Sequence, residues 1–454
     1  MNPTPDLFPD LEATTQDTNQ TAATKTPKPR FDGPPRLRYA QRHQVEFRMC
    51  ALDHLLPDDH EARTVWAYVE GLDFTPLLQK IQAVEHGPGA AAADPRILCA
   101  LWLYATLRGI GSARELDRRC DPTTGELAFQ WLAGGVSLNY HTLADFRTEH
   151  TDTLDNWLTT SVASLRQEGL VELERVAQDG VKVRASAGAA SFHREATLQR
   201  HLEEAEQQVQ ALKAELDADP TAANRRQQKA RQRAAGERQE RIQKALEQLP
   251  QVEAQKKLAD KAKARTSTTD ADARVMKMAD GGFRPAFNVQ LSSDVATQVI
   301  TGVGVTNSGG DQGKLAPMVA QHEERYADAP AEMLVDGGFV KKEDIEAVSP
   351  ETTVYAPVPQ PKDAGRDPHE PCANDGPAVA AWRLRMGTAE AKAIYRQRSR
   401  HECVNAIARN RGLQQFRLRG LAKVKAVVLW YVLAHNLVRA AALRAEREPV
   451  GRIP

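Results

Sequence analysis

The sequence predicts an α/β protein with a mixed sheet flanked by helices, interrupted by a helical hairpin and preceded by an all-α N-terminal domain. Apolar residues recur at every third or fourth position from about residue 45 to 168, which indicates helices. The period changes to two in the run LERVAQDGVKVRASA, which indicates a strand. Residues 193–265 are rich in Ala, Gln, Glu, Lys and Arg with one break at ADPTAAN, as in two helices joined by a turn.

These changes of pattern set the predicted boundaries. Residues 1–40 are rich in Thr, Pro and Asp and have few large apolar side chains, so we expect a disordered tail. The remainder divides into a helical N-terminal domain (41–168), an α/β domain (169–192 and 266–446), the inserted hairpin (193–265) and a tail (447–454). In the α/β domain, FRPAFNVQLSSD and TQVITGVGVTN are predicted to form a β-hairpin, followed by alternating helices and short strands.

The composition narrows the class of protein. Lys and Arg total 60, as do Asp and Glu, so a surface for a polyanion must come from local clustering. The five cysteines are widely spaced without a CxxC pair, which argues against a disulfide framework or a zinc finger and indicates a reducing cytoplasm. A signal-peptide pattern and a run of about 18 apolar residues are both lacking, so we expect no membrane partner.

Two acidic residues are predicted to lie on or at the end of buried strands. Asp179 falls on the same strand face as Ala177, Val181 and Val183. Asp336 closes the apolar run MLV and precedes two glycines, which allow a sharp turn. A buried carboxylate costs several kcal/mol unless something compensates it, so both acids need an explanation. For either acid alone, a helix N-cap or a turn former is the alternative.

A third acid, Glu402, stands alone among ten basic residues between positions 392 and 425. At about 3.6 residues per turn, four polar positions form one stripe on the predicted helix: Tyr395, Arg398, Glu402 and Arg409. Three residues in the opposite sector are expected to pack on the sheet: Cys403, Val404 and Ile407. The alternative is a solvated amphipathic helix with an incidental Arg398/Glu402 pair.

Three acids from two strands and a helix can hold two Mg²⁺ ions, which prefer oxygen ligands, and Mn²⁺ is expected to substitute. Two such metals about 4 Å apart activate the attacking oxygen and stabilise the leaving oxygen in phosphodiester chemistry. The basic residues around Glu402 would then hold the DNA backbone. The pattern therefore predicts a metal site made by Asp179, Asp336 and Glu402, with DNA as the substrate.

The four residues of the stripe resemble the Tyr-x2-Arg-x3-Glu-x6-Lys signature of the DDE transposases of bacterial insertion sequences, with Arg409 in place of Lys. We call these four the signature residues. QDGVKVRASA is similar to the first acidic strand of these enzymes, and LVDGGF is similar to the second. The run from Ala273, ARVMKMADGGFRPAFNVQLSSD, looks like the segment that re-enters the sheet after an insertion, and HTLADFR looks like the end of the preceding helical domain. The resemblance covers nearly everything beyond residue 40 and implies a ribonuclease H-like catalytic core.

The resemblance also implies a reaction, namely metal-dependent cleavage at the terminal inverted repeats of a mobile element and attack of the freed 3′-hydroxyl on target DNA. Asp179 would bridge the two metals, and Asp336 and Glu402 would each complete one site. The other signature residues would contact DNA beside the cleavage point. Because two element ends must be held together, a homodimer on double-stranded DNA is expected, in the bacterial cytoplasm.

Basic residues also occur in the N-terminal helices, and we predict that Arg118, Arg119 and Arg147 contact the terminal repeats through a helix-turn-helix. An ordinary helical bundle is the alternative. The second half of the hairpin, residues 225–265, holds 13 basic and 5 acidic residues, so nucleic-acid contact and a solvated arm both stay open there.

Three further residues have open interpretations. Asp311 is predicted to cap the helix that follows it, with a fourth site acid as the alternative. His141 and His401 are interpreted as structural or DNA-contacting. Three other functions also compete: a structure-selective nuclease of the same fold, a catalytically inactive transposase-derived DNA-binding protein, and a coiled-coil scaffold supported only by residues 193–265.

Overall fold

The computed structural model describes residues 51–81, 91–218, 225–256, 258–361 and 365–447. The predicted tail 1–40 lies outside the described residues, as do all but the first residue of the tail 447–454 and most of the turn ADPTAAN.

The region before the sheet is helical, as predicted. After a 3-10 helix (Leu52–Leu55) it contains α1 (Glu61–Glu70), α2 (Thr75–Leu78), α3 (Pro95–Leu107), α4 (Ala113–Arg119), α5 (Leu127–Ala133), α6 (Tyr140–Glu149) and α7 (Thr151–Gln167). The start of α3 follows from its sequence, because the Asp94 side chain accepts a hydrogen bond from Arg96 N and Pro95 occupies the first turn. Almost all of α3 is apolar and buried, so this helix forms the centre of the region.

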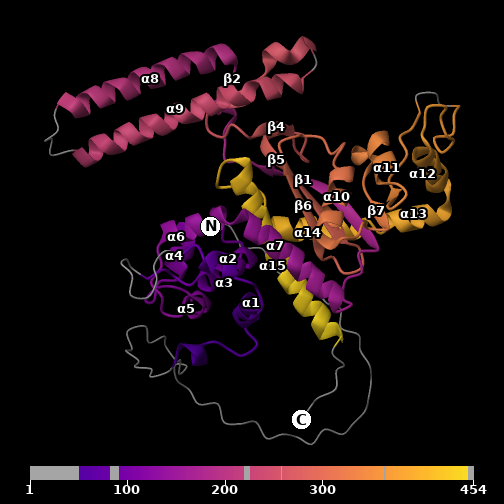
Figure 1. Cartoon of the computed structure of the whole chain (residues 1–454), viewed down its shortest axis with the longest axis horizontal. Coiled ribbons are helices and arrows are strands. Elements are labelled where there is room, and N and C mark those ends of the chain that lie inside the picture. The colour runs from indigo at the N-terminus through magenta and orange to yellow at the C-terminus, as the bar shows by residue number, and fades with distance from the viewer. Residues whose placement is uncertain (1–50, 82–90, 219–224, 257, 362–364, 448–454) are drawn as a thin grey trace, which may run out of the picture. The chain divides into compact units, whose positions relative to one another are not determined.

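The α/β part contains a six-stranded mixed sheet, which confirms the predicted fold class at this level (Figure 1). Its strands are β1 (Arg175–Arg184), β4 (Arg274–Lys277), β5 (Phe283–Asp294), β6 (Ile300–Thr306), β7 (Glu332–Leu334) and β8 (Thr353–Tyr355). β5 pairs antiparallel with β4, β6 and β1, and its pairing with β6 is the predicted hairpin. β1 and β7 pair in parallel, as do β7 and β8.

Both faces of β1 are covered. Val181 and Val183 are buried on one face. On the other face Gln178 is fully buried, and its Nε2 donates hydrogen bonds to Gln290 Oε1 at 3.1 Å and to Lys314 O at 3.1 Å. The Gln178 amide nitrogen is therefore satisfied by the neighbouring strand and by the residue that precedes α10, while its Oε1 has no hydrogen-bond partner among the described residues.

Helices follow and flank the strands: α10 (Leu315–Tyr326), α11 (Lys342–Val348), α12 (Pro377–Gly387), α13 (Ala389–Arg396), α14 (Ser399–Asn410) and α15 (Leu421–Arg447). α15 packs on β6 and also on α3, α6 and α7, and Figure 1 shows it running beside α7. It is long and apolar enough to cross a membrane, but 67% of its most apolar window is buried inside the protein, as expected for a core helix. Through α15, one hydrophobic core extends from the helical region into the sheet, and the predicted domain boundary at residue 168 stays a prediction.

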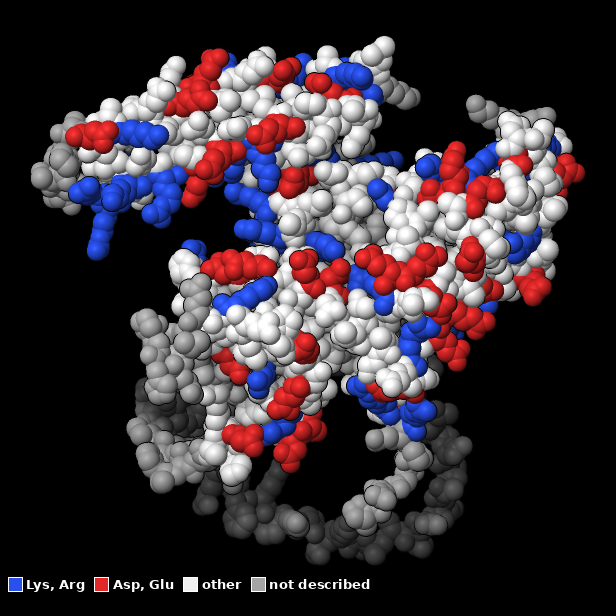
Figure 2. Space-filling model, in the orientation of Figure 1, with Lys and Arg blue, Asp and Glu red and all other residues white. Residues whose placement is uncertain are grey.

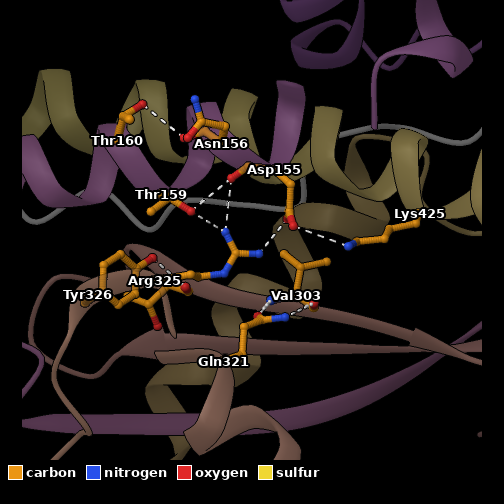
Figure 3. A network of polar contacts seen from close by, with 10 residues as sticks. Asp155, Asn156, Thr159, Thr160, Val303, Gln321, Arg325, Tyr326 and Lys425 are labelled. Atoms are coloured by element: carbon orange, nitrogen blue, oxygen red, sulfur yellow. Dashed lines mark hydrogen bonds and ion pairs between the residues drawn. The ribbon is translucent and has the colours of Figure 1, made fainter. Parts of the chain in front are cut away.

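A buried ion pair also joins the helical region to the sheet region (Figure 3). Arg325 of α10 contacts the Asp155 carboxylate of α7 at 2.5 Å and donates a hydrogen bond to Thr159 Oγ1 at 2.7 Å. Lys425 of α15 lies 3.3 Å from the second oxygen of Asp155. Only 6% of the Arg325 side chain is exposed, against 28% of that of Asp155, so this contact is partly shielded from water.

The predicted hairpin consists of α8 (Glu195–Ala218) and α9 (Arg225–Ala254), with the short strands β2 (Phe192–His193) and β3 (Thr266–Ser267) pairing at its base. Its two helices share a small apolar core of their own: Leu198, Ala205, Ile242, Ala245, Leu249 and Val252. Figure 2 shows Lys and Arg side chains gathered along one edge of the hairpin. The core explains why the two helices stay together although both are rich in charged residues.

Candidate active site

The sheet brings Asp179 and Asp336 side by side. The parallel pairing of β1 with β7 ends with Ala177 opposite Leu334; Asp179 lies two residues further along β1, and Asp336 lies two residues past the end of β7. The backbone of Asp336 is still extended, with φ −77° and ψ 172°. Neighbouring strands lie about 4.8 Å apart and side chains two residues apart share a face, so the two carboxylates project from the same face of adjacent strands.

The Asp179 carboxylate is half-buried and surrounded by specific partners. Gly180 N donates a hydrogen bond to Oδ1 at 2.8 Å, and Asn405 Nδ2 of α14 donates one to Oδ2 at 2.9 Å. Burial raises the pKa of the Asp179 carboxyl, and the negative charges of Asp336 and Asp311 raise it further, against the opposing effects of Gly180 N–H and Arg398. Asp179 therefore sits where an added cation would favour its ionised form.

Arg398 links the first acid to the third. Its guanidinium lies 3.2 Å from the Glu402 carboxylate and 4.0 Å from that of Asp179. It also lies 6.0 Å from the centre of the Tyr395 ring. Three of the four signature residues thus meet at Arg398, which faces Asp179, while Arg409 is exposed in the last turn of α14.

The sequence predicts one continuous helix for the four signature residues. The structure instead divides them between two helices, α13 and α14. α13 ends at Arg396 and α14 begins at Ser399, with Arg398 at the junction. Arg398 N donates to Tyr395 O at 3.0 Å and His401 N donates to Arg398 O at 2.9 Å, which are the shorter contacts of a 3-10 turn. Arg398 lies in this tighter turn and faces the carboxylates of Asp179 and Glu402.

The buried face of α14 also differs from the prediction. Val404 is buried as expected, but Ile407 is only partly buried and Cys403 is exposed, so the expected packing of Cys403 on the sheet is wrong. The fully buried His401 takes that place and shares a 2.7 Å hydrogen bond between Nδ1 and Ser293 Oγ. Burial lowers the pKa of His401 to about 3, so this ring is neutral and structural rather than DNA-contacting.

Asn405 was missed by the sequence reasoning although it is nine-tenths buried and contacts the first acid directly. Its Oδ1 has no hydrogen-bond partner among the described residues. The available signal was its position three residues after Glu402, because residues three apart share a helix face.

Asp311 does not cap the following helix, so that prediction is wrong. The residue at the start of α10 is Lys314, whose side chain makes no cap hydrogen bond, and Ala316 N in the first turn donates to Asp344 Oδ2 instead. Asp311 Oδ1 instead accepts hydrogen bonds from Asn288 Nδ2 and Gln290 Nε2, each at 2.7 Å. A side chain on Gly180 would clash with Asp311, so this acid lies over Gly180, on the face of β1 opposite to the Asp179 side chain. Its negative charge still raises the pKa of the Asp179 carboxyl, and the alternative of a fourth site acid stays a prediction.

The donor atoms around Asp179 suit a hard cation, because they are carboxylate oxygens. In the described part of the chain, however, no three His, Cys, Asp or Glu side chains lie close enough together to hold a metal ion. Asp336 has one oxygen engaged, since Oδ1 accepts from Gly338 N at 2.8 Å as the cap of a 3-10 helix (Gly337–Phe339). The Glu402 side chain is 62% exposed and paired with Arg398. Asp179 and Asp336 fit the predicted site, and Glu402 is near it without completing it.

The predicted DNA-contacting arginines of the helical region have different surroundings. Arg119 forms ion pairs with Glu115, at 3.3 Å, and with Glu126. Arg118 is exposed, and both arginines line a cavity of about 910 Å³ together with several acids. Arg147 is buried, with Nη1 donating to Gly111 O at 2.6 Å. Contact of these three arginines with DNA stays a prediction.

Two family models match the chain. A Transposase domain (DUF772) matches residues 51–149, which contain the three candidate arginines of the helical region. A Transposase DDE domain matches residues 375–441, which contain the four signature residues. Asp179 and Asp336 lie outside both matches. No curated protein and no solved structure matches the chain. The two family matches together support a DDE-type transposase.

Proposed function

We propose that the protein is a transposase that binds the ends of an insertion sequence and catalyses metal-dependent DNA cleavage and strand transfer to target DNA. The observation that carries the proposal is the meeting of Asp179, Asp336 and Arg398, because it joins two sheet acids to the segment that matches a transposase DDE domain. On this proposal the protein acts as a homodimer on double-stranded DNA in the bacterial cytoplasm.

The sheet supports a ribonuclease H-like core. Its strands lie in the order β4-β5-β1-β7-β8, with β6 also pairing with β5; β5 is antiparallel to β1 on one side, and β7 is parallel to it on the other. The proposed site lies where β7 ends and the chain turns at Gly337. Carboxyl ends of strands are the usual ligand positions in open α/β sheets.

Asp179, Asp336 and Glu402 would hold Mg²⁺, or Mn²⁺ in its place. Bound there, the metal supplies the positive charge that activates the attacking oxygen and stabilises the leaving oxygen. Asn405 holds the Asp179 carboxylate in position through its 2.9 Å hydrogen bond. Glu402 is free to join the set once Arg398 releases it, because an exposed pair of this kind contributes little stability.

The other signature residues would face the DNA. Arg398, released from the acids, can pair with a phosphate near the cleavage point, for which its planar fork is suited. Tyr395 lies beside it and offers a ring for an unstacked base. Arg409 is exposed in the last turn of α14 and is available for a neighbouring phosphate.

A second candidate is a catalytically inactive, transposase-derived DNA-binding protein. The exposure of Glu402 and the absence of a complete three-acid group in the described residues favour it. The two candidates differ in chemistry alone, since both would bind the ends of the element.

Cleavage of end DNA separates them. Linear DNA carrying both flanks of this protein's gene is incubated with Mg²⁺ and native protein, Glu402→Gln, or Glu390→Gln as a matched control on the exposed surface of α13. We expect cutting at the flanks by the native protein and by Glu390→Gln, and a loss of at least a hundredfold in Glu402→Gln. Binding without cutting by all three proteins, with Mg²⁺ or Mn²⁺, would establish the inactive candidate. Equal cutting by all three would remove Glu402 from the site.

A further inference from the structure

A second basic site lies away from the acids, where the helical region meets the far end of β1. Here a cavity of about 580 Å³ is lined by three arginines, Arg147, Arg184 and Arg417, and by no carboxylate. We call it the arginine pocket. Its other lining residues are small, apolar or uncharged polar groups, including Gly111 and Gln414. Three positive charges around one cavity repel one another, and a bound anion would offset this repulsion.

The pocket is built by backbone pairing rather than by flexible side chains alone. Arg184 N donates to Gln414 O at 3.1 Å, and Phe416 N donates to Arg184 O at 2.8 Å. The chain before α15 therefore continues the sheet at the end of β1 and holds Arg184 near Arg417. From the helical side, Trp430 Nε1 donates to Arg147 O at 3.0 Å and fixes the third arginine against α15.

Arg147 differs from the other two arginines of the arginine pocket because it is buried. It is only 7% exposed, and its Nε has no hydrogen-bond partner among the described residues. Its guanidinium lies 4.5 Å from the Trp102 ring centre and donates one hydrogen bond, to Gly111 O. No carboxylate in the described structure forms an ion pair with it or with the other two arginines. An uncompensated buried cation is costly, so this residue is placed to meet a negative charge from outside the chain.

The basic surface extends beyond the pocket. An adjoining cavity of about 370 Å³ shares Arg147 and Arg417 and is also lined by Arg114 and Lys423. Arg114 stacks over the Tyr140 ring at 4.9 Å, which holds its guanidinium at this surface. One acid, Asp145, lines this second cavity. The two cavities thus form a continuous basic track, larger than one small anion.

We propose that the arginine pocket binds a backbone phosphodiester of DNA, with Arg147 at its base and Arg184 and Arg417 at its rim. The choice of DNA over a free anion rests on the proposed function and on the length of the basic track. Guanidinium groups suit phosphate because they donate paired hydrogen bonds to its oxygens. The pocket would anchor the duplex on the protein independently of the acids at Asp179.

Rim variants test the pocket with little risk to folding, because Arg184 and Arg417 are both exposed. The full chain carrying Arg184→Gln and Arg417→Gln together is compared with native protein and with Arg96→Gln, an exposed arginine of α3 outside the pocket. Affinity for end DNA is measured at several salt concentrations, with cleavage recorded in parallel. Inorganic phosphate is titrated as a separate probe by ³¹P NMR line broadening.

We expect the double variant to bind end DNA at least tenfold more weakly, with the slope of log affinity against log salt reduced by about one, as for the loss of one phosphate contact. Its phosphate-induced line broadening should fall, while Arg96→Gln behaves as native. Unchanged DNA affinity and slope in the double variant refute the pocket as a DNA site, even if native protein cuts the flanks. If native protein neither binds nor cuts the flanks, the proposed function fails. In that event the phosphate titration separates two outcomes. If only the double variant loses the line broadening, the pocket is a site for a free anion and the DNA assignment is overturned. If the line broadening is equal in all three proteins, the pocket is not an anion site.

Discussion

Replacing Asp155 with Ala tests how strongly the helical region is fastened to the sheet region. The Asp155 carboxylate of α7 contacts Arg325 of α10 at 2.5 Å and Lys425 of α15 at 3.3 Å (Figure 3). Removing it leaves the Arg325 guanidinium, whose side chain is 6% exposed, without a counter-ion. We therefore expect the Asp155→Ala protein to be destabilised through the charge it leaves behind.

The magnitude follows from the burial of each partner. Breaking a fully buried pair costs about 3 to 5 kcal/mol. Asp155 is 28% exposed, and Arg325 keeps hydrogen bonds to Thr159 Oγ1 and to the Asp155 carbonyl, so the loss should be smaller. We expect about 2 to 3 kcal/mol for Asp155→Ala, and about 1 kcal/mol or less for the double variant Asp155→Ala with Arg325→Met, which leaves no buried charge.

Urea unfolding of the native protein, both single variants and the double variant gives the coupling energy directly. Lys425→Met is the matched control, because Lys425 is 36% exposed and its loss should cost less than 1 kcal/mol. A coupling between Asp155 and Arg325 of about 2 kcal/mol is expected. Additive effects within about 0.5 kcal/mol would refute the argument that a stranded charge dominates.

Two further predictions concern Asp179. Asn405→Ala removes a hydrogen bond to the ionised carboxylate, so the pKa of Asp179 should rise. The acid limb of the pH profile for cleavage should then move up by about one pH unit. Asn410→Ala, at an exposed position of α14, is the control. An unmoved limb would show that the hydrogen bond does not affect ionisation. Asp179→Asn should raise the thermal midpoint at pH 7, because burial and neighbouring acids penalise the ionised native residue. Since the folded pKa is raised, the gain should vanish as the pH falls below about 3.9, where unfolded Asp is also protonated. A gain that persists at low pH would point to packing instead of charge.

The regular elements were predictable because their patterns are local. The period-two run around Asp179 became β1, the run before Asp336 became β7, and the charged segment became two helices. The break between α13 and α14 was not predictable from the sequence. The junction at Arg398 contains neither Gly nor Pro, and its tight turn comes from hydrogen-bond spacing alone.

The environment of the candidate site was only partly predictable. The acids themselves were visible because a carboxylate beside a buried strand is costly, which marks a position without reference to its partners. Asn405 and Asp311 act through contacts 226 and 21 residues away along the chain, to Asp179 and Gln290, and such pairs leave no local pattern. The arginine pocket is a stronger case, since its members come from α6, β1 and the chain before α15.

A capping or turn-forming role, the alternative to a metal site, explains only one of the two sheet acids. Asp336 does cap a 3-10 helix, and an Asn would serve that purpose as well. Capping does not account for Asp179, whose carboxyl pKa is raised by burial and also by the negative charge of Asp336. The charge of Asp336 opposes the ionisation of Asp179, which costs stability. A cation between them removes that cost, and this energetic argument, rather than the family match of a segment that contains neither acid, is what supports a metal site at this edge of the sheet.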